Sequence, residues 1–143
     1  MGESCRINQI EMPAEAARLA ALRDRLKGKI LAGVEGVLVN GPENDSVAGR
    51  LPHNLSLSFA GLDAETLLLS LNDVAVSSGS ACLSGQIKAS HVIEALGVDP
   101  RYALCTVRFG LGRWTTEEEV DHAAKRVIES VASLREVNAP AAK

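Results

Sequence analysis

Strict alternation of side-chain type between Cys105 and Leu111 is the feature that most limits how this chain can fold. Apolar positions alternate here with polar or small ones, namely Cys105, Val107, Phe109 and Leu111 against Thr106, Arg108 and Gly110. Successive side chains of a strand point to opposite faces of a sheet, so the run predicts a strand with one buried face. A buried face needs a covering layer, which the chain must supply as amphipathic helices.

The first covering helix is predicted from Ala14 to about Ala32, where apolar residues recur with the period of an amphipathic helix. Pro13 suits its first turn and Gly33 its end. Residues 1–13 precede this predicted helix.

A second covering helix is predicted near the other end of the chain. Thr115 or Thr116, followed three residues later by Glu118 or Glu119, is typical of a capping box. The helix that follows should bury one apolar stripe, formed by Val120, Ala123, Val127, Val131 and Leu134. The tail 137–143 is expected to fray.

The middle of the chain supplies shorter elements. Strands are predicted at 36–40, at 55–59 and at 74–76, and helices at 64–72 and from Ser90, as the cap, through 96. The order helix, strand, strand, helix, strand, loop, helix, strand, helix predicts an α/β (α+β) domain. We expect it to span 14–136, with a small sheet of about four strands covered by helices.

Composition narrows the function classes. The chain has 143 residues, of which 46% are hydrophobic, and a formal net charge of −3. This mild acidity and the lack of a run of like charges argue against nucleic-acid and membrane partners. The amino end has no signal-peptide pattern, and no apolar stretch is long enough to span a membrane, which predicts a cytoplasmic protein. Three cysteines and three histidines, none at metal-ligand spacing, give no metal hypothesis.

The segment SSGSACLSG, residues 77–85, is the most unusual stretch of the sequence. Serine and glycine leave little bulk around Cys82, so this loop could bring a thiol close to a ligand and move without disturbing a core. A flexible linker with an incidental cysteine is the alternative. The placement after a strand favours function, since reactive cysteines sit in exposed and adaptable loops.

Arg108 is the second candidate, because its strand face is shared with Thr106 and with Gly110, which leaves room beside the guanidinium. An arginine presents a planar fork that matches a carboxylate, although an edge arginine facing water is the competing interpretation. Cys105, on the opposite face, is predicted to be a core residue. For His53 and Asn54 we favour a turn role over a role in a site.

Four segments, VNGP…RLPHNLSLSF, LLLSLND-x-AVSSGSAC-x-SG, SHVIEALGV and VRFGLGRWTTEEEVD, together resemble the carboxyl-terminal small domain of NifS/IscS-type cysteine desulfurases. The resemblance runs from about Glu15 to Leu134. The first residues do not look like the linker of the family, so residues 1–13 are expected to be an unrelated N-terminal extension. It implies the small domain of a fold-type I pyridoxal 5′-phosphate (PLP) enzyme of the class V aminotransferase family. These homodimeric enzymes convert L-cysteine to L-alanine and a protein persulfide, which supplies iron–sulfur cluster assembly.

The resemblance also implies site roles. Cys82 matches the nucleophile that becomes the persulfide, Arg108 the arginine that holds the substrate carboxylate, and Ser80 a serine associated with cofactor phosphate binding. The long loop is similar to that of the group whose cysteine delivers sulfur directly to acceptor proteins.

The large domain of the family has no counterpart in this sequence. None of Lys27, Lys29, Lys88, Lys125 or Lys143 has the context of the Schiff-base lysine. We therefore expect a truncated domain, a mobile-element fragment or an expressed domain that binds no PLP by itself and is active only with a large domain. A standalone persulfide acceptor without PLP, or a folded remnant with a protein-interaction role, are the alternatives. Sulfur-acceptor or scaffold proteins and a weak homodimer are the expected partners.

Overall fold

The computed structural model describes residues 2–42, 50–78 and 90–138. Cys82 and Ser80 lie outside the described residues. The elements follow one another along the chain as α1 (Gly2–Gly33), β1 (Val37–Val39), β2 (Asn54–Phe59), α2 (Ala64–Ser70), β3 (Ser77–Ser78), α3 (His91–Ala95), α4 (Pro100–Ala103), β4 (Thr106–Gly110) and α5 (Glu117–Asn138). In this described part of the chain, none of the helices is both long and apolar enough to cross a membrane.

The strands of the described residues form one four-stranded sheet in the order β1-β2-β4-β3, and every neighbouring pair is antiparallel. The two central strands pair Leu55 with Phe109 and Leu57 with Val107, so their apolar side chains share one face. This confirms both the alternation predicted for β4 and the expectation of a small sheet of four strands covered by helices.

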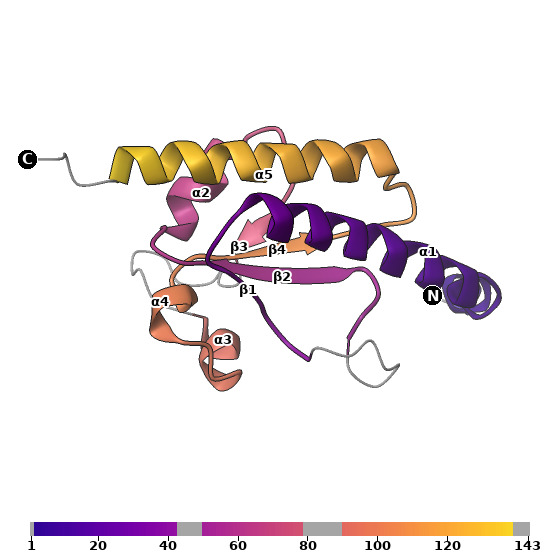
Figure 1. Cartoon of the computed structure of the whole chain (residues 1–143). Helices are drawn as coiled ribbons and strands as arrows, with labels where there is room; N and C mark the ends of the chain where they lie inside the picture. The colour runs from indigo at the N-terminus through magenta and orange to yellow at the C-terminus, as the bar shows by residue number, and fades with distance from the viewer. Residues whose placement is uncertain (1, 43–49, 79–89, 139–143) are drawn as a thin grey trace, which may run out of the picture.

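Helices α1 and α5 cover the apolar face of the sheet and lie side by side along it (Figure 1). Leu26 and Ile30 of α1 and Val127 of α5 are buried against the strands, as the helical periodicity predicts. The two helices approach closely at Gly33, where an added Cβ would lie 2.6 Å from Cδ1 of Ile128. A Cβ at this position would therefore require the Ile128 side chain to move.

The opposite face of the sheet is covered at one end by α3 and α4 (Figure 1). Ser58 and Thr106 point to this side and are nevertheless buried. Their hydroxyls lie 2.7 Å apart in a hydrogen bond, which satisfies both groups away from water. The sheet is thus a middle layer here, and β2 is buried more completely than its alternation of leucine and serine predicts.

The local caps agree with the sequence. Asp63 accepts a hydrogen bond from the Thr66 amide at 2.8 Å, and Ser90 accepts one from the Val92 amide at 3.3 Å. At the start of α5, the Thr116 amide donates to Glu119 at 2.9 Å, and the Glu119 amide donates to the Thr116 hydroxyl at 3.2 Å. This reciprocal pair is the expected capping box.

Two helices are longer than predicted. The sequence places the start of the first helix at Ala14, whereas α1 begins at Gly2 and contains Pro13. An interior proline removes one backbone hydrogen bond and bends a helix without necessarily ending it, and the N-terminal turns of α1 lie at an angle to the rest (Figure 1). The tail was expected to fray from Val137, but α5 continues through Asn138.

Two predictions in the middle of the chain are wrong in position or content. The strand expected at 74–76 lies instead at Ser77–Ser78, where the backbone pairs with β4. The short helix α4 was not expected. Asp99 caps it by accepting from the Arg101 amide at 2.9 Å, and Pro100 stands in its first turn, where its missing N–H costs nothing.

Candidate functional site

Arg108 lies in the middle of β4 on the face away from α1 and α5. Its backbone neighbours are Ser56 on β2 and Ser77 on β3. The side chain is exposed, and it forms no hydrogen bond or ion pair with the described residues. A Cβ added at Gly110 would meet nothing within 4 Å, so the space expected beside the arginine is present.

A pocket of about 310 Å³ adjoins Arg108. It is bounded by the end of β1, by residues 50–51, by β2, by α3 and by β4. Its described lining consists of Asn40, Gly41, Pro42, Arg50, Leu51, Asn54, Ser56, Ser90, Val92, Ile93, Leu96, Thr106 and Arg108. Among these residues there are two arginines and no carboxylate.

Arg50 is held in this pocket by backbone carbonyls. Its Nη2 donates to the carbonyl oxygens of Asn40 and Pro42, each at 2.9 Å, and its Nε donates to Pro42 at 3.3 Å. Gly41, between the two acceptors, has a φ of +94°, and an added Cβ would lie 3.3 Å from Nη2 of Arg50. The guanidinium therefore rests on a turn that requires glycine.

The floor of the pocket is a chain of hydrogen bonds. The Asn40 amide donates to the hydroxyls of Ser56 at 3.1 Å and of Ser58 at 2.9 Å, and Ser58 in turn is bonded to Thr106. These contacts tie β1, β2 and β4 together beneath the pocket. Asn40 thus supports both arginines, since its carbonyl holds Arg50 and its side chain holds Ser56, the cross-strand neighbour of Arg108.

The two arginines of this pocket differ from several arginines of the helices, which have carboxylate partners. Arg25 of α1 binds Asp121 with a nitrogen–oxygen distance of 2.7 Å, and Arg126 of α5 binds Asp73 at 3.0 Å. Arg50 and Arg108 form no ion pair with the described residues. Their guanidinium groups can therefore bind a carboxylate or another oxyanion from solution.

The other singled-out residues lie elsewhere. Cys105 is fully buried beneath the sheet, as predicted, and burial raises the pKa of its thiol to about 12. His53 is exposed and takes part in the turn through its backbone, whose carbonyl accepts from the Leu111 amide at 2.9 Å. Asn54, for which a turn role was favoured, lines the pocket.

Sequence reasoning missed Arg50, which falls at the end of a polar stretch and has no periodic pattern around it. The position of Arg50 depends on the turn at Gly41. The dipeptide Gly41-Pro42 predicts that a turn forms, but not which side chain its carbonyls bind. Neighbouring residues in the sequence therefore do not show that the turn binds Arg50.

The described residues fit part of what a PLP enzyme needs. The pocket offers cations for a carboxylate, but its described lining contains no lysine whose amine could bond the cofactor aldehyde. The described lysines are on helices and paired with acids, Lys27 with Asp24, Lys29 with Asp121 and Lys125 with Glu129. Nor do the described ranges contain a group of His, Cys, Asp or Glu side chains able to hold a metal ion.

Residues 2–123 match the family described as aminotransferase class-V, and the chain belongs to this family. It is 48% identical over 138 residues to the cysteine desulfurase IscS of Pseudomonas aeruginosa (strain LESB58), covering 96% of this chain and 33% of the relative. The cysteine desulfurase IscS of Anaeromyxobacter sp. (strain Fw109-5) is 46% identical, with the same coverage. The chain thus spans about a third of the length of these relatives, and the domain limits 14–136 stay a prediction.

Solved structures agree with the fold. A protein described as NifS-like superposes with a TM-score of 0.68 and 29% identity, over 89% of this chain and 31% of that one. A NifS-like protein from Rickettsia africae ESF-5 gives a TM-score of 0.61 at 23% identity, over 85% of this chain and 29% of that one, and this likeness concerns the fold alone.

Proposed function

We propose that this chain carries the carboxylate-binding and persulfide-forming part of a cysteine desulfurase, and that it acts together with a large domain. The observation that carries the proposal is Arg108, an arginine without an ion pair to any described residue, in a pocket whose described lining has no acid. Its cross-strand neighbour Ser77 precedes Cys82 by five residues. Five residues extend over at most about 18 Å, so the covalent chain keeps the thiol within reach of this part of the sheet.

In the proposed reaction, Arg108 binds the carboxylate of L-cysteine through two parallel N–H···O bonds and fixes the orientation of the substrate. The Cys82 thiolate attacks the substrate sulfur, the carbon–sulfur bond breaks, and the carbon takes up a proton. Cys82–SH and L-cysteine thereby become Cys82–S–SH and L-alanine, with atoms and electrons balanced. PLP, when bound with the help of the large domain, supplies the electron sink for this cleavage. Ser80 is the proposed contact to its phosphate.

The persulfide sulfur would then pass to acceptor proteins for iron–sulfur cluster assembly in the cytoplasm. Exposed apolar side chains at the rim of the pocket, among them Leu51, Val92 and Leu96, support contact with another protein surface. For the chain by itself, a weak homodimer is the proposed association.

A chimeric enzyme tests the proposal. This chain would replace the matching third of the Pseudomonas relative, and alanine and sulfide would be measured with L-cysteine as substrate. We expect an active chimera, loss of the Cys82 persulfide in Cys82→Ser, and a rise in KM of at least about tenfold in Arg108→Ala, or about 1.4 kcal/mol. Arg101→Ala is the matched control, because Arg101 is exposed and pairs with Asp99 outside the pocket. A folded, PLP-loaded chimera that forms neither alanine nor persulfide would overturn the proposal.

The exposed apolar rim of the pocket, which another protein could contact, favours a second candidate, a persulfide acceptor that works without PLP. Incubation of the chain with an intact desulfurase and L-cysteine would then add the mass of one sulfur atom to Cys82. If Cys82 stays unmodified while the donor enzyme carries its own persulfide, this second function is excluded.

A further inference from the structure

Arg50 gives the pocket a second fixed cation, and the reaction proposed above uses only Arg108. The two backbone carbonyls that hold Arg50 are neutral, so they orient its guanidinium without cancelling its charge. They engage Nε and Nη2, whereas Nη1 has no partner among the described residues. A cation with free donors is therefore held at a defined place in the pocket.

Arg50 and Arg108 are two like charges in one cavity of about 310 Å³ whose described lining contains no acid, so they repel each other. An anion that contacts only Arg108 relieves part of this repulsion, and a ligand with two acidic groups relieves more. The protein as a whole has a net charge of −3, so general attraction of anions to the molecule does not explain such binding. The neutral lining residues Asn54, Ser56 and Ser90 add polar groups and no competing charge.

We infer that this pocket binds small molecules with two acidic groups, such as a short dicarboxylic acid or an amino acid whose side chain ends in an acid. Arg108 takes one carboxylate and Arg50 takes the second acidic group. The inference rests on the proposed function for the role of Arg108, and it adds Arg50 as a residue that determines ligand specificity.

Gly41 makes this arrangement testable without removal of a charge. Its φ of +94° disfavours other residues, and a Cβ there would press on Nη2 of Arg50 at 3.3 Å. Gly41→Ala should therefore displace the Arg50 guanidinium and leave Arg108, on another strand, in place.

The experiment compares succinate with acetate as probes of the full chain, titrated at constant ionic strength and followed through backbone amide NMR signals of β2 and β4. We expect succinate to bind about tenfold more tightly than acetate, because a second charge-assisted contact is worth at least this factor. Arg50→Ala should remove most of this preference with little change for acetate, and Gly41→Ala should reduce it. Arg101→Ala, which removes a cation outside the pocket, should leave both affinities unchanged.

Each other outcome is also decisive. Equal affinities for the two probes, or an Arg50→Ala variant that weakens both equally, would overturn the inference and leave Arg108 as a carboxylate site. Failure of both probes to bind would overturn the carboxylate role of Arg108 as well. If Arg50→Ala does not fold, Arg50→Gln provides the same comparison, since its amide can still donate to a carbonyl of the turn.

Discussion

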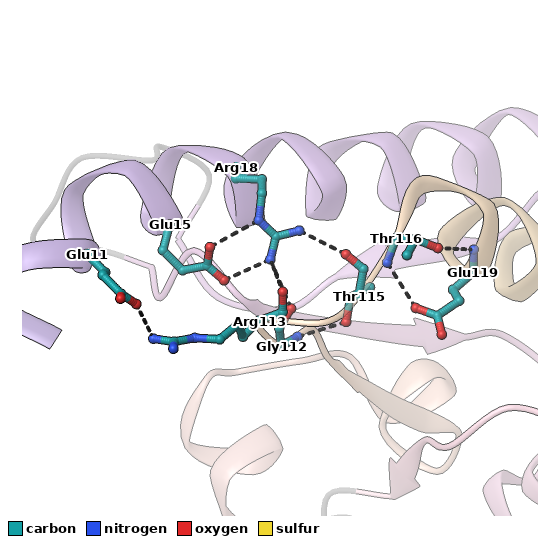
Figure 2. A network of polar contacts seen from close by, with 8 residues as sticks. All are labelled: Glu11, Glu15, Arg18, Gly112, Arg113, Thr115, Thr116 and Glu119. Carbon is teal, nitrogen blue, oxygen red and sulfur yellow. Dashed lines mark hydrogen bonds and ion pairs between the residues drawn. The ribbon is translucent and has the colours of Figure 1, made fainter. Parts of the chain in front are cut away.

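Arg18 anchors the loop that joins β4 to α5, and its removal gives a sharp test of the packing described above. Its Nη1 donates to the Thr115 carbonyl at 2.8 Å, and its Nη2 donates to the carbonyls of Gly112 at 3.2 Å and Arg113 at 2.8 Å (Figure 2). Glu15, one turn earlier on α1, holds the same guanidinium at 2.7 Å. One side chain of α1 thus fixes the loop that follows the strand of the site.

The magnitude follows from the exposure of these contacts. The bond to Thr115 is partly buried and contributes about 1 kcal/mol, whereas the two exposed carbonyl bonds and the pair with Glu15 contribute a few tenths each. Arg18→Ala should therefore lower the free energy of unfolding by about 2 kcal/mol. With a urea m-value of about 2 kcal/mol/M, the midpoint should fall by about 1 M.

Urea denaturation followed by circular dichroism measures this loss. Arg6→Ala is the matched control, because Arg6 lies on the same helix and forms only an exposed pair with Glu3 among the described residues. Arg18→Lys should lose about half as much as Arg18→Ala, since an ammonium can still reach one carbonyl. A double-mutant cycle with Glu15→Ala separates the ion pair from the loop contacts. Equal losses in Arg18→Ala and Arg6→Ala would refute the anchoring role.

Three further outcomes follow from burial and charge. Cys5 is exposed and should be alkylated under native conditions, and the Ser/Gly-rich sequence around Cys82 predicts the same for that thiol. Cys105 should react only on unfolding, since burial raises the pKa of its thiol to about 12. Equal native labelling of Cys5 and Cys105, measured by peptide mass spectrometry, would contradict the burial of Cys105. Hydrogen bonds from two α1 cations hold the pKa of Asp121 well below its usual range. As the pH falls, Asp121 is therefore protonated in the unfolded chain before it is protonated in the folded one. The stability that this carboxylate contributes is complete above about pH 4 and is lost as the pH falls through its folded-state pKa. Denaturation at several pH values should show a flatter acid decline for Asp121→Asn, and an unchanged slope would argue against the pairing. Phe59→Ala should cost about 3–5 kcal/mol of unfolding free energy, whereas Leu69→Ala, 74% exposed, should change it by less than about 0.5 kcal/mol, as calorimetry would show.

The parts of the fold that the sequence predicts well are those decided by neighbours along the chain. The caps at Asp63, Ser90 and Thr116 depend on residues two or three positions away, and the alternation in β4 is visible within five residues. Each of these patterns contains both the interacting group and its partner, so no knowledge of tertiary structure is required.

The errors concern elements that tertiary contacts decide. Residues 74–76, with two valines, have the composition of a strand, yet the ladder forms at Ser77 and Ser78 because there the backbone lies beside β4. Strand propensity reflects packing on neighbouring strands, so it yields to the position that the partner makes available. Pro13 predicts a helix start, because proline is favoured in the first turn of a helix. In the structure Pro13 lies inside α1, where the helix continues past the missing backbone hydrogen bond.

The two arginines of the pocket show the same division within the candidate site. Arg108 could be singled out because its strand carries an apolar face opposite to it and a glycine two positions on, which are local facts. Arg50 reaches the pocket through carbonyls of Asn40 and Pro42, eight or more residues earlier in the chain, and the left-handed turn at Gly41 alone brings them together. The sequence around a single charged residue in a polar segment does not indicate which backbone carbonyls its side chain will bind. Arg50, which we infer to determine ligand specificity, therefore could not be predicted from the sequence, because a tertiary contact with the backbone sets its position.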